Sequence, residues 1–390
     1  MNLITSKIKS RNIVNSISLI DKSNWDKVSK DQNIYLSYSY LIALEGANKD
    51  EMDFYYSISY NDRGNPILIS AFQLVTFSDR AIHKSILSKQ FCALKSKLFS
   101  HNLLICGNIF SDGENGFIYN DSLTPSEAVD EMSVICEEIK QSSKKTKKKV
   151  SFILFKEFWE KNNTYSPLFS KNRFKEFMVD VNMVLPIHES WKSKDDYLFS
   201  LKTKYRTRAK SVFKKSKNIL IKDLSSLEIN SNLTIIGELH ANVIEKSNFS
   251  LGQINPLTFV KLKENLGDQF ILRGAFLNDK MVGFSTSFIH NNILEANYVG
   301  IDYELNFDLA IYQRLLYDYT ELAIQLKAKE LQLGRTSELI KSALGALPEN
   351  MKLYVKHRST LPNLLLKPIL HFVSPSKFEL RKPFKAEYSN

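Results

Sequence analysis

The sequence predicts a mixed α/β fold with α+β character, in two consecutive domains that each contain one mixed β-sheet. The main observation is an order of elements that occurs twice: an antiparallel hairpin, a strand, a helix, a second strand and a helix. This order gives antiparallel strands that lead into a parallel pair joined by a right-handed helical crossover. A doubly wound sheet would instead alternate strands and helices throughout. The repetition indicates an internal duplication, with expected domains at residues 1–185 and 186–390.

The first half shows the order clearly. Strand-forming residues at Phe54–Tyr60 and Ile67–Phe77 flank the turn sequence Asn61–Pro66, which predicts a hairpin. The other expected elements are helices near Asn24–Lys30, Ser37–Leu44 and Pro125–Gln141, strands at Leu103–Asn108 and Val150–Phe155, and an extended stretch at Glu176–Leu185.

The second half repeats this order, and its hairpin again turns on an Asn-Asp pair, Asn278–Asp279. Apolar residues recur with a 3.6-residue period between Asp308 and Lys327, which predicts the crossover helix. The expected strands are Phe270–Leu277, Met281–His290, Ile293–Ile301 and Glu330–Leu333.

Composition narrows the class of protein. The chain has 390 residues, 43% of them hydrophobic, so it can bury a large core. Cys92, Cys106 and Cys136 are widely spaced, which predicts neither a disulfide framework nor a zinc site. We see no signal peptide and no run of 18 apolar residues. The sequence therefore predicts a cytoplasmic protein of a reducing compartment, without a metal site.

The net charge of +11 is concentrated in two segments, Lys144–Lys149 and Lys192–Lys217. The second segment is expected to form one helix, Ser193–Ser216, with Ser193 as its N-cap. Its cations favour an anionic partner and leave several alternatives open: a solvated face, a phosphate-rich substrate, RNA, or an anionic membrane. We find no zinc-finger, RNP or helix-turn-helix signal, so we expect no sequence-specific DNA binding.

The stretch Leu331–Ala346 reads as a strand, a tight turn at Gly334 and the start of a helix. Helix N-termini present unsatisfied N–H groups and partial positive charge, so they receive anions well. Arg335 and Lys341 add two cations there. On the expected helix, Ile340 belongs to an apolar stripe beside Lys341. The alternative is an ordinary amphipathic helix with a solvated lysine.

Four segments resemble the FemAB-like branch of the GNAT superfamily, which includes tandem-GNAT proteins described as peptidoglycan-biosynthesis-like or BioF-like acetyltransferases. The basic segment Leu201–Ile221 resembles the family's helix that runs into a strand, and Tyr298–Leu316 resembles its strand-to-helix crossover. Gly334–Ala346 resembles the Gly…Lys…Gly signature of the second GNAT unit. Arg381–Lys385 resembles the usual C-terminal ending.

The resemblance implies two tandem GNAT-like domains, with the active site in the second. It implies transfer of an acyl or aminoacyl group from an activated donor to an amine, without a covalent enzyme intermediate. The donor would be acyl-CoA, acyl carrier protein or aminoacyl-tRNA, used as a co-substrate, with no tightly bound cofactor. The pathway would concern the cell envelope or peptidoglycan, and the protein could contact the inner face of the membrane.

The same resemblance assigns catalytic roles. Lys341 would neutralise a phosphate or a developing oxyanion, the kind of stabilisation worth about 10²–10³ in rate. Tyr298 lies on the strand that borders the reacting carbonyl in GNAT folds, with Glu295 and Asn297 expected on its opposite side. Tyr298 or Glu295 would accept the amine proton. A plain strand aromatic is the alternative for Tyr298.

Substrate-binding roles fall on further residues. Arg206 and Arg335 would bind phosphates of the donor or acceptor, and Asn297 would contact the substrate. His357 and Arg358 end a predicted strand and are also expected to meet the substrate.

One segment departs from the family pattern. GNAT enzymes cradle the CoA pyrophosphate with a glycine-rich turn before the crossover helix. Here Gly300–Asp308 has one early glycine and three acids, which would repel a pyrophosphate. This favours aminoacyl-tRNA or another donor. The alternative function is a non-catalytic, degenerate GNAT-like module that binds RNA or a membrane surface through the Lys192–Lys217 helix.

Overall fold

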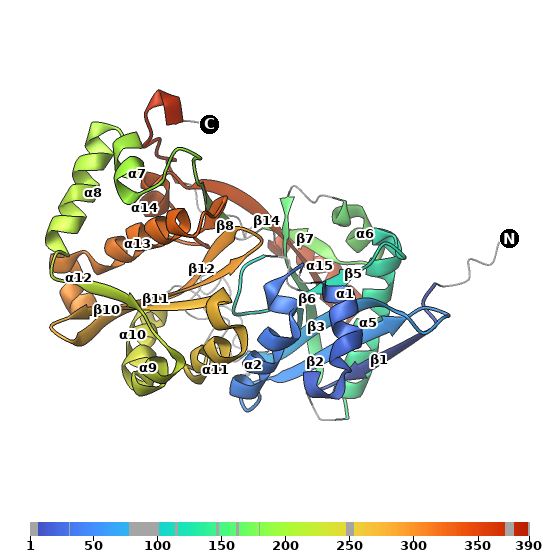
Figure 1. Ribbon diagram of the computed structural model, residues 1–390. Helices are drawn as coiled ribbons and strands as arrows, with labels where there is room; N and C mark the ends of the chain where they lie inside the picture. The colour runs from blue at the N-terminus through green and yellow to red at the C-terminus, as the bar shows by residue number, and fades with distance from the viewer. Residues whose placement is uncertain are drawn as a thin grey trace, which may run out of the picture. The chain divides into compact units, whose positions relative to one another are not determined.

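The computed structural model describes residues 7–30, 32–77, 101–113, 116–145, 148–160, 164–178, 180–246, 253–370 and 378–388 (Figure 1). The chain forms two compact units. Unit 1 is built from Met1–Val179 and Met351–Pro375, and unit 2 from Asp180–Ser247, Gln253–Asn350 and Ser376–Asn390. These units differ from the expected ranges 1–185 and 186–390 in two places. Unit 2 begins before Pro186, and the chain returns to unit 1 after Asn350.

The sheet of unit 1 has the strand order β1-β2-β3-β4-β6-β14. Among the described strands of this unit, only β4 and β6 pair in parallel, and helix α5 connects them. Two short strands lie off this path, because β5 pairs with β3 and β7 pairs with β14. The strands are β1 (Ser10–Val14), β2 (Asp53–Tyr60), β3 (Pro66–Phe77), β4 (His101–Cys106), β5 (Phe117–Tyr119), β6 (Val150–Trp159), β7 (Lys175–Phe177) and β14 (Leu347–His357).

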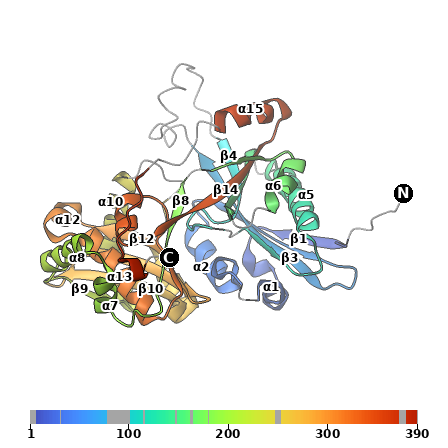
Figure 2. The same cartoon turned by 90° about the horizontal axis from the view of Figure 1, so that it is seen from above.

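Helices cover both faces of this sheet, with α1 and α2 on one side and α5 and α6 on the other (Figure 2). Helix α5 begins with a full capping box between Thr124 and Glu127. Cys106 and Cys136 are buried free thiols, and burial raises the pKa of both; Cys92 lies outside the described residues. The helices are α1 (Lys22–Ser29), α2 (Tyr38–Asn48), α5 (Pro125–Ser143), α6 (Tyr165–Lys171) and α15 (Thr360–Leu370).

The sheet of unit 2 has the strand order β14-β8-β13-β12-β11-β10-β9. Here β12 and β13 form the parallel pair. Strand β14 serves both units: Leu347–Asn350 pair with β8, and Met351–His357 pair with β6. The other strands are β8 (Val181–Pro186), β9 (Leu220–Asp223), β10 (Phe270–Leu277), β11 (Lys280–His290), β12 (Ile293–Ile301) and β13 (Glu330–Gln332).

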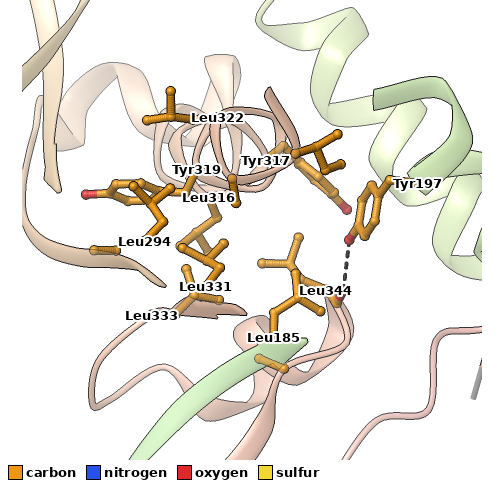
Figure 3. Packing of buried hydrophobic residues seen from close by; sticks show 14 of the residues in the cluster. Leu185, Tyr197, Leu294, Leu316, Tyr317, Tyr319, Leu322, Leu331, Leu333 and Leu344 are labelled. Atoms are coloured by element: carbon orange, nitrogen blue, oxygen red, sulfur yellow. Dashed lines mark hydrogen bonds between the residues drawn. The ribbon is translucent and has the colours of Figure 1, made fainter. Parts of the chain in front are cut away.

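Helices α9, α10 and α11 lie on one face of this sheet, and α7, α8, α13 and α14 lie on the other (Figure 1). The core under α13 joins side chains from β8, β12, β13, α7 and α13, with the Tyr197 hydroxyl donating to the Leu344 carbonyl at 2.9 Å (Figure 3). The helices are α7 (Lys194–Ser200), α8 (Thr203–Lys215), α9 (Ser226–Ser231), α10 (Leu233–Lys246), α11 (Leu257–Leu266), α12 (Tyr303–Leu309), α13 (Ile311–Gln325) and α14 (Glu338–Ala343).

The predicted fold class is confirmed, since each unit contains an antiparallel hairpin followed by a parallel pair with a helical crossover. The expected single helix Ser193–Ser216 is wrong, because the chain breaks it into α7 and α8. At the break, Leu201 forms a β-bridge with Phe384, and the Lys202 amide donates to the Pro383 carbonyl. The C-terminal segment thus takes the hydrogen bonds that would have continued the helix.

Candidate functional site

Strand β12 carries three of the predicted site residues, and a β-bulge interrupts its pairing beside them. One residue of β11, Thr286, lies opposite two residues of β12, Asn297 and Tyr298. The Tyr298 amide donates to Thr286 Oγ1 at 2.9 Å. Bulges re-aim side chains and occur often beside active sites. The bulge therefore marks this part of β12 as a candidate site.

The bulge is held from helix α13 by the hydroxyl of Tyr319. This hydroxyl donates to the carbonyl oxygen of Thr286 at 2.8 Å and lies 3.3 Å from that of Tyr298. Because a bulge interrupts the strand ladder, such carbonyls need a donor from elsewhere. Burial raises the pKa of Tyr319, so the hydroxyl keeps the proton that it donates.

The bulge also corrects the expected distribution of side chains along β12. Strict alternation placed Glu295 and Asn297 opposite Tyr298. Leu294 belongs to the core under α13, so Glu295 points to the other face of the sheet. Tyr298 lies on that same face, because its ring contacts His240 of α10 with 5.3 Å between the centroids. The one extra residue shifts the alternation and brings Tyr298 to the side of Glu295.

His240 is a residue that the sequence analysis did not assign to the site, because Glu238 and His240, two residues apart on a helix, do not face each other. It is buried in α10, its ring stands at 90° to that of Tyr298, and it also contacts Phe259 of α11. Burial lowers the pKa of His240 to about 4, so the imidazole is neutral at pH 7. Within the described residues its Nδ1 atom has no hydrogen-bond partner. The available signal was its position four residues after the buried Ile236, on the apolar face of the helix.

Lys341, the residue expected to neutralise an anion, is only 4% exposed. Its Nζ donates to the carbonyl oxygens of Gly334 at 3.1 Å and Arg335 at 2.6 Å. The expected apolar stripe is wrong, because Ile340 is 37% exposed whereas Lys341 is buried. The reason is the short α14, whose preceding loop folds back and presents its carbonyls to the ammonium. These contacts hold the loop, and the catalytic role of Lys341 stays a prediction.

The two glycines of the Gly…Lys…Gly segment have separate structural causes. Gly334 has φ +72° and is followed by Thr336 and Ser337, which also have positive φ. Gly345 has φ +105°, and a Cβ there would lie 2.1 Å from the ring of Phe384. The segment therefore needs a left-handed turn at its start and an open space for the C-terminal segment at its end.

The two arginines expected to bind phosphate both lie in unit 2. Arg335 is half-buried in the loop that Lys341 holds, and Arg206 is half-buried on α8. Within the described residues, Arg206 forms no ion pair. Their phosphate-binding roles stay predictions.

His357 and Arg358 lie at the end of β14 and belong to unit 1, so the expectation that the second domain carries them is corrected. The cause is the path of β14, which leaves unit 2 after Asn350. The His357 ring packs against Phe152 with 4.9 Å between centroids, and its Nδ1 accepts the Ser359 amide at 3.0 Å. Arg358 is exposed.

The segment between β12 and the crossover helix α13 forms the short helix α12, and the start of α12 is occupied by the chain's own acids. The Asp302 carboxylate accepts the amides of Glu304 at 3.0 Å and Leu305 at 3.3 Å, which caps α12. Glu304 adds a second acid in the first turn. An N-terminus that already holds a carboxylate is a poor place for a pyrophosphate.

Unit 1 contains a cavity of about 390 Å³ that sequence reasoning missed. It is lined by Cys106 and Phe155, the last parallel pair of β4 and β6, and so lies where these strands stop pairing. Gln32, Phe117 and Tyr165 lie on other walls. The available signal was the glycine-rich segment after β4.

A buried ion pair lies beside this cavity. The Lys156 ammonium donates to the carbonyl oxygens of Asn108, at 2.9 Å, and Ser111. It also lies 3.3 Å from the carboxylate of Glu157, which accepts the Gly113 amide at 3.0 Å. Glu157 has φ +59°, a strained backbone for a residue with a Cβ, and such strain often occurs at functional sites.

The described residues were compared with the requirements of a metal site and of a membrane-spanning helix. No group of three or more His, Cys, Asp or Glu side chains could hold a metal ion in the described part of the chain. None of its described helices has the length and hydropathy of a membrane span.

No protein-family model matches this sequence, and no curated protein matches it. Solved structures do. FemX matches with 11% identity and a TM-score of 0.54, over 88% of this chain and 96% of that chain. A tandem GNAT protein from the clavulanic acid biosynthesis pathway matches with 6% identity and a TM-score of 0.53, over 90% of this chain and 99% of that chain.

The C-terminal domain of a putative lysylphosphatidylglycerol synthetase from Agrobacterium fabrum also matches, with 7% identity, a TM-score of 0.49, and coverage of 90% of this chain and 95% of that chain. Similarity at such identities concerns the fold. The chain therefore shares its fold with FemX and with this tandem GNAT protein.

Proposed function

We propose that this chain is an acyl- or aminoacyl-transferase that acts on an amine, with its reacting centre at the bulge of β12 in unit 2. The observation that carries the proposal is the bulge itself, which brings Tyr298 to the same face as Glu295 and against His240. Polar side chains that meet at a strand irregularity provide groups for proton transfer.

In the proposed reaction, the amine nitrogen of the acceptor attacks the donor carbonyl carbon. The bond from that carbon to the donor's sulfur or oxygen breaks, and the thiol or hydroxyl leaves. The amine proton passes to Glu295, or the Tyr298 hydroxyl takes it while giving up its own proton. One proton then reaches the leaving sulfur or oxygen, so that the donor departs as a thiol or hydroxyl. His240 is a positioning residue here, because its buried, neutral ring packs perpendicular to the ring of Tyr298.

The donor is the less constrained partner. The acids that cap α12 disfavour a pyrophosphate at that helix start, which supports aminoacyl-tRNA or an acyl carrier protein over acyl-CoA. A thermal-shift screen with acyl-CoAs, acyl carrier protein and aminoacyl-tRNA identifies the donor, since a ligand that binds the folded state raises the melting temperature.

The decisive variant is Tyr298→Phe, which removes one hydroxyl and keeps the ring. With the donor found in the screen, we expect transfer to an amine to slow by about 10²–10⁴. Glu295→Gln is the parallel test of the other proton acceptor. Tyr303→Phe is the matched control, since Tyr303 is a half-buried tyrosine of the same unit whose ring lies under Lys246.

The outcomes separate clearly. A rate loss in Tyr298→Phe or Glu295→Gln, with the control and all melting temperatures unchanged, supports the proposal. Transfer at the normal rate in both variants would place the chemistry elsewhere. Absence of turnover with every donor class would leave the chain a binding module.

A further inference from the structure

Helix α8 presents a face of positive charge, and no acid in the described part of the chain forms an ion pair with it. Its thirteen residues, Thr203–Lys215, include six cations and no Asp or Glu. Within the described residues, none of these cations forms an ion pair, whereas lysines elsewhere pair with acids, as Lys222 does with Glu228 at 2.8 Å. A charged face without counter-charges is typical of a surface that meets an anionic partner.

The exposed cations form two rows on the outer side of the helix. Lys204, Arg208 and Lys215 follow helical spacing along one row, and Lys210 and Lys214 form the second. The helix is about 20 Å long, so the rows span an extended surface. Figure 1 shows α8 at the outer edge of unit 2, with α12 near its C-terminal end.

Large apolar side chains stand exposed at both ends of this basic helix. Phe307 of α12 is 83% exposed, and the Lys215 ammonium lies 5.3 Å from the centre of its ring. Phe199 of α7 is 58% exposed, with the Lys385 ammonium 3.6 Å from its ring centre. Exposed aromatics flanked by lysines are typical of protein surfaces that lie in a lipid interface.

We propose that this face, which comprises the two cation rows of α8 together with Phe307 and Phe199, docks on an anionic phospholipid surface. The lysines and Arg208 attract the headgroups, each adding to the affinity while it stays within a Debye length of the surface. The two phenylalanines enter the boundary between headgroups and acyl chains.

The same observations argue against RNA as the occupant. Proteins that hold single-stranded nucleic acid place aromatic rings among their cations so that bases can stack. Here the exposed rings of Phe307 and Phe199 stand at the two ends of α8 and not between its cations. The aromatics of α8 itself, Tyr205 and Phe213, pack inward against the core of unit 2. Four of the five exposed cations in the rows are lysines, whereas the planar guanidinium of arginine is the usual choice for nucleic-acid contacts.

The test uses the full chain and co-sedimentation with vesicles. One set contains phosphatidylcholine alone, and the other contains equal parts of phosphatidylcholine and phosphatidylglycerol. We expect binding to the anionic vesicles alone, with an affinity that falls as salt rises. The double variant Lys210→Glu/Lys214→Glu should weaken binding at least about 30-fold, because two attractive cations are lost. Phe307→Ser should weaken it about 10-fold.

The matched control is Lys144→Glu/Lys145→Glu, which changes the net charge equally at two exposed lysines of unit 1. Its binding should stay within about twofold of the unaltered chain, because these lysines lie outside the proposed face. Lys210→Gln/Lys214→Gln serves as a second variant if the charge reversal alters the melting temperature. A labelled tRNA is titrated in parallel.

Three results would overturn the inference. The first is the absence of binding to phosphatidylglycerol vesicles. The second is an equal loss of binding in the unit 1 control, which would indicate a general effect of net charge. The third is tight binding of tRNA that the α8 variants weaken, together with weak binding of vesicles. None of these measurements needs a substrate, so they do not depend on the transferase proposal.

Discussion

The two units end their parallel strand pairs differently, although in each a buried lysine lies further along the chain from the last pair. In unit 1, β4 and β6 pair over five residue pairs, and Lys156 comes directly after the last of these pairs, within β6. In unit 2, β12 and β13 pair over only three, and Lys341 lies further on, in α14. Both ammonium groups donate to two backbone carbonyls of a neighbouring loop.

The difference lies in what surrounds each lysine. Lys156 has a buried carboxylate beside it, Glu157, and an open cavity next to it. Lys341 lies under the loop that begins at Gly334, whose backbone folds over it. A buried lysine can therefore hold a loop as a clamp, that is, by hydrogen bonds to the loop's carbonyl oxygens. The unfolding free energy that these contacts contribute should depend on the charges around the lysine. The predictions below test that comparison.

The largest expected effect is that of Lys156→Met. This variant keeps the length of the side chain but leaves the Glu157 carboxylate buried without its cation. Removing one partner of a buried pair costs about 3–5 kcal/mol of unfolding free energy. Chemical denaturation measures the loss, and hydrogen exchange should locate it in unit 1. The double variant Lys156→Met/Glu157→Gln should recover part of it, and a double variant less stable than the single one would contradict the ion-pair argument.

The second expected effect is a loss of stability in unit 2 when the pH falls, caused by His240. The pKa of His240 is lowered to about 4 in the folded chain, against an ordinary value near 6.5. Above pH 6.5 the histidine is neutral in both states and its effect on stability is constant. As pH falls from 6.5 to 4, the unfolded chain takes up a proton that the folded chain refuses, so unit 2 loses about 3 kcal/mol.

Hydrogen exchange at several pH values checks this expectation, because the loss should concentrate in α10 and β12. The His240→Leu variant keeps the apolar contacts with Tyr298 and removes the titrating group. Its stability between pH 6.5 and 4 should vary less than that of the unaltered chain. If the two curves have the same slope, other groups cause the acid sensitivity.

Periodic patterns predicted the elements well, because burial of one face dictates them. The pattern of strand-forming residues between turn residues predicted a strand at Ile293–Ile301, which is β12. The 3.6-residue period of apolar residues predicted most of α13. Patterns could not predict the bulge, because an inserted residue leaves no mark when both Asn297 and Tyr298 are only half-buried. The extra residue of the bulge is the reason why Tyr298 lies on the face of the sheet opposite to the one expected.

The lysines show a second limit. Helical spacing treats a lysine as exposed unless a partner is known, and the partners of Lys341 are backbone carbonyls that carry no sequence signal. The left-handed Thr336 and Ser337 that help to shape the loop are not glycines, so composition did not reveal them either. The burial of His240 was easier to predict from the sequence, since the helical period places it on the apolar face of α10.

The smallest of the three effects is that of Lys341→Met, and it decides between two roles for this lysine. Loss of the contacts between Lys341 and the loop should cost less than loss of the Lys156 pair, because water can reach the half-buried loop and satisfy its carbonyls. Loss of the charge-assisted hydrogen bonds should lower the unfolding free energy by about 2 kcal/mol. Transfer activity, measured at a temperature where the variant is fully folded, should fall little.

If activity instead disappears while stability is unchanged, Lys341 contacts the reacting groups and its carbonyl contacts are secondary. If Lys341→Met costs as much as Lys156→Met, the buried Glu157 carboxylate does not set the size of the Lys156 effect.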